Sequence, residues 1–72
     1  MNWDRIEGNW KQLRGKVRET WGRLTDDQLD TIAGRRDMLA GSLQDSYGIA
    51  RDEAEKQIDD FEARCERDRW VQ

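Results

Sequence analysis

Apolar side chains recur at helical spacing over the first third of the chain. Intervals of three or four residues separate Trp3, Ile6, Trp10, Leu13, Val17, Trp21 and Leu24. At about 100° of rotation per residue, these positions form one narrow stripe on an α-helix. The spacing predicts a firm helix over about 9–21, preceded at 3–7 by an added turn or a frayed lead-in, because Gly8 weakens continuity. Gly22 is placed to end this helix in a left-handed cap.

A capping box predicts the start of a second, shorter helix over about 26–33. The Thr25 hydroxyl can accept from the amide of Gln28, while the Gln28 side chain reaches back to Thr25. We expect this helix to end at Gly34. Its inward positions are predicted to be Leu29, Ile32 and Ala33.

Two more helices follow the same plan, at about 35–46 and 51–66. Gly48 is placed to close the first of them. Their inward faces are predicted to be Leu39, Leu43 and Tyr47 in the first, and Ala54, Ile58, Phe61 and Cys65 in the second. Trp70 lies beyond the regular pattern and is expected to fold back onto the core. The predicted fold is therefore all-α, with four short helices in two packed hairpins of about 9–33 and 35–66.

The glycines support an internal repeat of 26 residues. All six fall into two triplets with seven-residue spacing, Gly8, Gly15 and Gly22, then Gly34, Gly41 and Gly48. Other residues move with them, such as Leu13 onto Leu39 and Trp21 onto Tyr47. Each helical hairpin would be one copy, and neither could bury its apolar face alone.

Composition limits the chemistry that this 72-residue domain can perform. The chain has no histidine, and its single cysteine, Cys65, can form neither an internal disulfide nor a thiolate metal cluster. We therefore expect no catalytic residue, no cofactor and no metal. No apolar run approaches the ~20 residues that cross a bilayer, and no signal peptide is apparent. A single thiol fits a reducing cytoplasm. The prediction is a cytoplasmic, monomeric protein without a membrane partner.

Charge is placed unevenly along the chain. The net charge is −3, yet residues 1–24 carry six Lys/Arg against three Asp/Glu, and residues 25–72 carry seven against thirteen. Attraction between the two halves is the plainer reading of this asymmetry. A nucleic-acid interface would need a stronger basic excess.

The sequence resembles the CsbD-like family of small bacterial proteins. The run from Gly8 to Val17, continued by the segment from Trp21 to Asp27, carries the resemblance. A later stretch that includes residues 34–37 and 47–48 is similar to a longer subgroup of that family. The resemblance implies four short helices in two crossed hairpins, similar to the SAM-like and helix-hairpin-helix group. It also implies a cytoplasmic protein tied to general stress responses, and it brings no catalytic or ligand residues.

Two features remain as candidates for a partner surface. Lys11, Arg14 and Arg18, with Lys16 beside them, line the exposed sides of the first helix, where they are either a solvated face or phosphate contacts. Gly15 and Gly41 interrupt predicted helices, at about 0.5–1 kcal/mol each relative to alanine. Four explanations are open for these glycines: close approach of another helix, duplication of a tolerated residue, a bare backbone strip where a partner docks, or a helix kept deliberately weak.

The sequence thus favours a non-enzymatic, stress-associated interaction or protective protein. The binding partner would be a protein. The alternative is a nucleic-acid-binding module that uses the basic face of the first helix. Trp10 and Trp21 are expected in the core, whereas Trp3 and Trp70 suit either the core or a partner surface.

Overall fold

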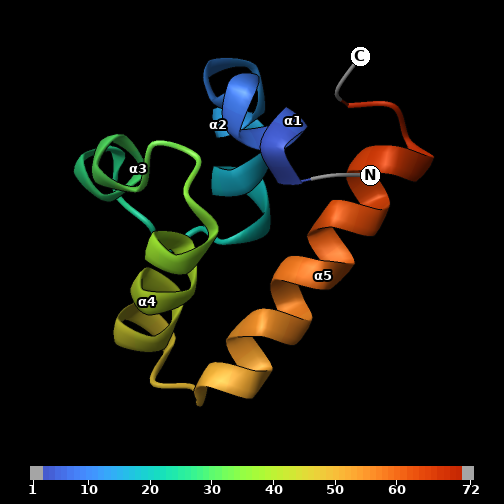
Figure 1. Cartoon of the computed structure of the whole chain (residues 1–72). Coiled ribbons are helices and arrows are strands. Elements are labelled where there is room, and N and C mark those ends of the chain that lie inside the picture. The colour runs from blue at the N-terminus through green and yellow to red at the C-terminus, as the bar shows by residue number, and fades with distance from the viewer. Residues whose placement is uncertain (1–2, 71–72) are drawn as a thin grey trace.

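The computed structural model describes residues 3–70, and this part of the chain holds five α-helices and no strand. They are α1 (Trp3–Gly8), α2 (Trp10–Thr20), α3 (Asp26–Ile32), α4 (Arg36–Tyr47) and α5 (Arg51–Arg67). Figure 1 shows α5 running along one side of the molecule, with α3 and α4 on the opposite side and α1 and α2 at one end between them. Helix α4 contacts both α3 and α5 and so links the middle of the chain to its end.

The expected count of four helices is corrected to five, because residues 3–8 form a helix of their own. The break lies at Asn9, whose amide donates to the carbonyls of Arg5 and Ile6 at 3.1 and 3.2 Å. The Asn9 side-chain nitrogen donates to the same Arg5 carbonyl at 2.7 Å. Glycine and asparagine both disfavour helix interiors, and asparagine competes for backbone groups through its side chain. The junction between α1 and α2 is therefore a stable break rather than frayed chain.

The core consists largely of the apolar positions that the sequence predicts, with Ala40 in addition. Among the residues described, the buried set comprises Ile6, Trp10, Leu13, Val17, Trp21, Leu24, Leu29, Ile32, Leu39, Ala40, Leu43, Ala54, Ile58, Phe61 and Cys65. Trp3, Tyr47 and Trp70 are half-buried and pack against this cluster. The expected fold-back of Trp70 onto the core is thus confirmed. Both tryptophans that suited either environment, Trp3 and Trp70, belong in part to the core.

Two predictions about helix ends are wrong. Gly22 does not adopt a left-handed conformation, and α2 instead ends at Trp21, with φ −125° and ψ 80°. The Trp21 side chain is buried in the core, so tertiary packing determines the direction of the chain after α2. Ala33 does not face inward. It is exposed and left-handed at φ 48°, because the chain reverses at residues 33–34 to start α4.

Other helix ends follow their local signals. Thr25 and Gln28 form both hydrogen bonds of the expected capping box, at 3.2 and 2.9 Å. Gly48 closes α4 in the left-handed conformation, with φ 64°. These ends are set by residues close in sequence, which is why the local pattern predicts them.

An ion-pair cluster around Arg36 joins three helices. Its guanidinium lies 3.1 Å from a Glu55 oxygen and 2.6 Å from an Asp59 oxygen, both on α5. The same guanidinium stacks over the Trp3 ring of α1 at 5.6 Å. Partial burial lowers the pKa of Arg36, but the hydrogen bond to Asp59 and the two carboxylate charges outweigh it and raise the pKa overall. Arg36 therefore fixes α1 and α5 against the start of α4.

Candidate functional site

The predicted partner surface is divided between two helices. Lys11, Arg14, Gly15 and Arg18 lie on α2, and Gly41 lies on α4. Lys11, Gly15 and Arg18 are exposed, whereas Arg14 and Gly41 are half-buried. Lys11 also lines a shallow hollow at the α1–α2 junction together with Glu7 and Gln12.

The basic side of α2 is neutralised largely from within the molecule. Arg14 lies 2.6 Å from an Asp30 oxygen and 3.8 Å from an Asp26 oxygen, and Arg18 lies 2.6 Å from Asp26. Both aspartates belong to α3, so the ion pairs tie α2 to α3. Attraction between the basic start of the chain and its acidic remainder is thus realised in the fold. Arg14 and Arg18 are not free phosphate ligands, and nothing in this arrangement favours nucleic-acid binding.

No neighbouring helix packs closely against the two mid-helix glycines. A Cβ built at Gly15 or at Gly41 would meet no atom within 4 Å. Close approach of another helix, one of the explanations that the sequence left open, is therefore wrong at both positions. Each glycine weakens its helix without a packing reason. Duplication of a tolerated residue, a bare strip for a partner and a helix kept deliberately weak remain as explanations.

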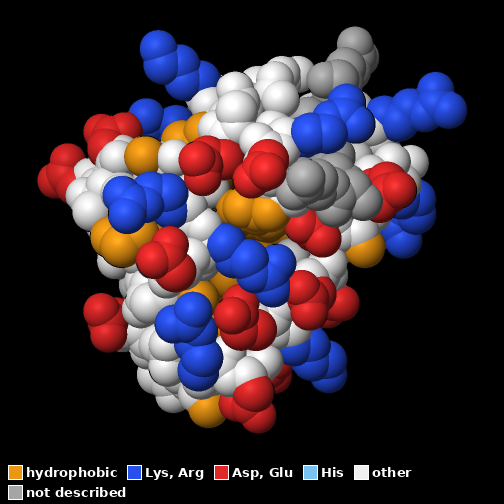
Figure 2. Space-filling view, viewed as in Figure 1, with side chains coloured by type: hydrophobic (Ala, Val, Ile, Leu, Met, Phe, Trp, Pro, Cys, Tyr) orange, Lys and Arg blue, Asp and Glu red, His pale blue; other side chains and the backbone are white. Residues whose placement is uncertain are grey.

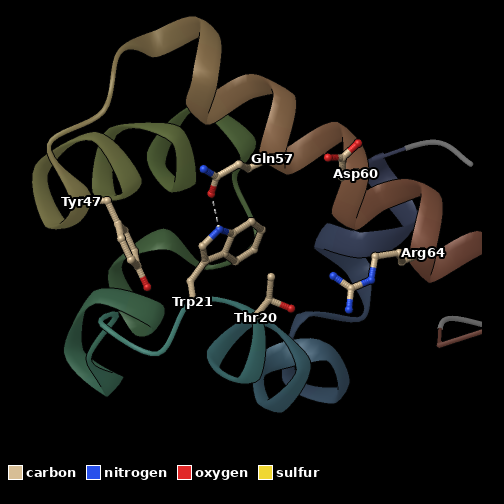
Figure 3. A pocket seen from close by; sticks show the side chains of 6 residues that line it. All are labelled: Thr20, Trp21, Tyr47, Gln57, Asp60 and Arg64. Atoms are coloured by element: carbon tan, nitrogen blue, oxygen red, sulfur yellow. Dashed lines mark hydrogen bonds between the residues drawn. The ribbon is translucent and has the colours of Figure 1, made fainter.

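A hollow of about 280 Å³ lies where the ends of α2 and α4 meet the middle of α5 (Figure 3). It is lined by Thr20, Trp21, Tyr47, Gln57, Asp60 and Arg64. Figure 3 shows the Trp21 indole at its centre, between Tyr47 and the side chains of α5. Gln57, Asp60 and Arg64 could not be predicted as lining residues, because polar residues on a helix carry no signal that they converge on a distant tryptophan.

Hydrogen bonds hold the walls of this hollow. The indole N–H of Trp21 donates to the Gln57 side-chain oxygen at 2.9 Å. The Tyr47 hydroxyl accepts from the backbone amide of Arg23 at 3.1 Å. Trp21 and Tyr47 therefore use their polar atoms to anchor the ends of α2 and α4.

The thiol of Cys65 is buried, as the sequence predicts. Burial raises the pKa of Cys65 to about 11, with a further increase from the negative charge of Glu62. A thiolate is the reactive form of cysteine, so burial keeps this thiol protonated and unreactive at neutral pH. Cys65 acts as a small hydrophobe on the inner face of α5.

Charged side chains of both signs are spread over one face of the molecule, between uncharged and some hydrophobic atoms (Figure 2). Figure 2 shows Lys and Arg interspersed with Asp and Glu, without a large area of one sign on that face. Over residues 3–70, no group of three or more acidic or cysteine side chains is arranged to hold a metal ion. In the same part of the chain, no helix has the length and apolar character needed to cross a membrane.

Taken together, the helices, the mixed surface and the anchored hollow define a small all-α protein. Residues 4–56 match the family described as CsbD-like. The chain belongs to this CsbD-like family, which is of uncharacterised function.

Curated relatives agree with this assignment over most of the chain. The chain is 53% identical over 70 residues to UPF0337 protein YjbJ of Escherichia coli K12, covering 97% of this chain and 100% of the relative. It is 53% identical over 66 residues to UPF0337 protein NE2439 of Nitrosomonas europaea, with 92% and 70% covered. It is 59% identical over 61 residues to UPF0337 protein RPA4217 of Rhodopseudomonas palustris, with 85% and 92% covered. These names assign no activity to the relatives.

Proposed function

We propose that this chain is a non-enzymatic, stress-associated interaction or protective protein of the bacterial cytoplasm, which acts by binding rather than by chemistry. Membership of the CsbD-like family supports the setting. The high share of charged residues, 40%, supports a strongly hydrated surface. The partner would be a protein, and the chain itself would act as a monomer.

The observation that carries the proposal is the open space around Gly15 and Gly41. A glycine that weakens its helix and is not required for packing lowers folding stability without any structural benefit. Alanine would fit both positions and would strengthen α2 and α4. The two glycines therefore make sense if α2 and α4 must expose bare backbone or loosen when a partner binds.

We also propose that the chain is a single domain over 1–72, in which two hairpins, about 9–33 and 35–66, repeat one 26-residue unit. Gly15 in α2 and Gly41 in α4 support the repeat because they occupy equivalent places and share the same open surroundings. Gly22 and Gly48 differ in conformation although they are equivalent in sequence. The two copies would thus have diverged at their helix ends.

A protection assay tests the proposed function. A labile enzyme is dried or heated with the wild-type chain, with the Gly15→Ala/Gly41→Ala variant, or with an unrelated helical protein of equal mass and net charge. We expect the wild-type chain to preserve more enzyme activity than the unrelated protein, and the variant to protect less despite being more stable. Equal protection by all three proteins would contradict the proposal.

A further inference from the structure

The chain turns back on itself immediately after α5. Figure 1 shows this reversal beyond the last turn of the helix. The amide of Asp68 donates to the Arg64 carbonyl at 2.9 Å, Arg69 is left-handed at φ 55°, and the amide of Trp70 donates to the Cys65 carbonyl at 3.0 Å. A six-to-one hydrogen bond around a left-handed residue is the pattern of a Schellman motif. Residues 68–70 therefore follow a defined path back toward the core.

Trp70 contacts side chains of two helices at the end of this path. Its ring lies 5.7 Å from the Phe61 ring of α5, tilted by 53°. The Lys16 ammonium of α2 lies 4.9 Å from the centroid of the Trp70 ring, and the Arg64 guanidinium of α5 lies 5.6 Å from it. Cations over a tryptophan face are attracted to its π-electrons. Trp70 thus bridges α2 and α5.

The residues beneath the bridge are fully buried although the chain around them is exposed. Phe61 and Cys65 have no exposed area, whereas the four residues at 66–69 are all exposed. Apolar contact between the residue after a Schellman turn and the last helical turn is a regular feature of the motif. Trp70 therefore covers the final inner turn of α5 from one side, while the Trp21 ring, 5.2 Å from that of Phe61, covers Phe61 as well.

Several features make this segment easy to open. Trp70 and Lys16 are only half-buried, and Arg64 is exposed. Arg69 adopts a backbone conformation that side chains with a Cβ disfavour, so its release relieves strain. Few buried contacts and a strained turn are the physical marks of a segment with low local stability.

We propose that residues 68–70 form a strap that opens while the five helices stay folded, and that its opening uncovers Phe61 and Cys65. In the closed structure no large hydrophobic side chain of residues 3–70 is exposed. Opening of the strap exposes the apolar surface of Phe61 and Cys65 while α2 and α4 stay folded. The inference goes beyond the proposed function and does not depend on it.

Thiol–disulfide exchange at Cys65 measures the opening directly. The probe is 5,5′-dithiobis(2-nitrobenzoate). The Cys65 thiol gives its proton to buffer, the thiolate forms a mixed disulfide, and the reagent disulfide breaks to release one thionitrobenzoate. Exchange rates are recorded on the folded full chain in increasing urea. Local opening exposes little surface, so we expect the rate to be independent of urea at low concentrations. A rate that follows the slope of global unfolding from zero urea upward would overturn the proposal.

Two substitutions in the strap should move this rate in opposite directions. We expect Trp70→Ala to raise the exchange rate in zero urea about tenfold or more. Arg69→Gly should lower it about threefold, because glycine accepts the left-handed conformation and holds the strap closed. Trp3→Ala is the matched control: it removes a half-buried tryptophan elsewhere, so its exchange rate at low urea should stay near wild type.

The opposite signs keep the proposal testable if Trp70→Ala fails to fold. In that case Trp70→Phe, which keeps an aromatic ring, should raise the rate by a smaller factor, and Arg69→Gly alone should still slow exchange. An Arg69→Gly rate equal to or above wild type would overturn the proposal. So would strap variants whose rates changed only in proportion to their global stability.

Discussion

The backbone of Gly34 lies against that of Glu7, at the point where α1 crosses the turn between α3 and α4. A Cβ at residue 34 would stand 2.8 Å from the Glu7 Cα, a distance that real Cβ atoms essentially never show. Gly34 also has φ 82°, and its carbonyl accepts from the Trp3 indole at 2.8 Å. Among the glycines, Gly34 is therefore the one that the fold requires on two independent grounds.

Replacement of this glycine should displace α1. We expect Gly34→Ala to lower the free energy of unfolding by about 2–4 kcal/mol, from backbone strain and overpacking together. Gly48→Ala is the matched control, since Gly48 is left-handed but has open space around its Cβ position, and it should cost only about 1 kcal/mol. Urea denaturation of both variants measures the difference. Equal losses would show that the contact with Glu7 contributes nothing.

The mid-helix glycines should respond in the opposite sense. We expect Gly15→Ala and Gly41→Ala each to raise the free energy of unfolding by about 0.5–1 kcal/mol, because alanine restricts the unfolded chain and fits the open space. Thermal or urea denaturation checks this. A loss of stability at either position would mean that its glycine serves the fold after all.

The capping box at the start of α3 should contribute measurably to stability. We expect Thr25→Ala to cost about 1 kcal/mol, since the Gln28 amide loses its acceptor. Thr31→Ala is a suitable control, because the Thr31 hydroxyl donates to the Asp27 carbonyl on the exposed side of the same helix. That substitution should change stability by less than about 0.5 kcal/mol. Similar losses in both variants would contradict a specific role for the cap.

Alkaline pH should weaken the fold through Cys65. The thiol has an ordinary pKa of 9.0 and a folded-state pKa of about 11, so the folded state retains the proton longer than the unfolded state. The contribution of the protonated Cys65 thiol to the free energy of unfolding is complete below pH 9 and is lost as the pH rises from 9 to 11. Between pH 9 and pH 11, wild type should lose about 2 kcal/mol of unfolding free energy relative to the Cys65→Ala variant. Denaturation under reducing conditions measures it. A constant difference would contradict burial of the thiol.

Much of the fold could be predicted from local patterns. The stripe from Ile6 to Leu24 and the inner face of α5 are buried as expected, because helical periodicity records which side of a helix meets the core. The capping box at Thr25 and the cap at Gly48 also depend on residues close in sequence. The start of α3 and the end of α4 could therefore be predicted from the sequence.

Features that depend on distant residues could not be predicted. The contact of Gly34 with Glu7 and the pull of the core on Trp21 arise only when separate helices meet. The same holds for the candidate surface. Arg14 and Arg18 look like a basic face in the sequence, but the fold places Asp26 and Asp30 against them. Charge counts along a chain do not reveal which charges neutralise one another in space.

Site-specific photo-crosslinking in stressed bacterial cells tests the central claim, that the chain acts by binding a protein partner on the surface around Gly15. A photoreactive amino acid is placed at Lys11 or Arg18, which are exposed on α2, or at the exposed controls Glu53 and Arg67 on α5. We expect discrete crosslinked protein at the two α2 positions, stronger under stress, and none at the controls. No crosslinks at Lys11 and Arg18, or equal crosslinks at all four positions, would contradict it.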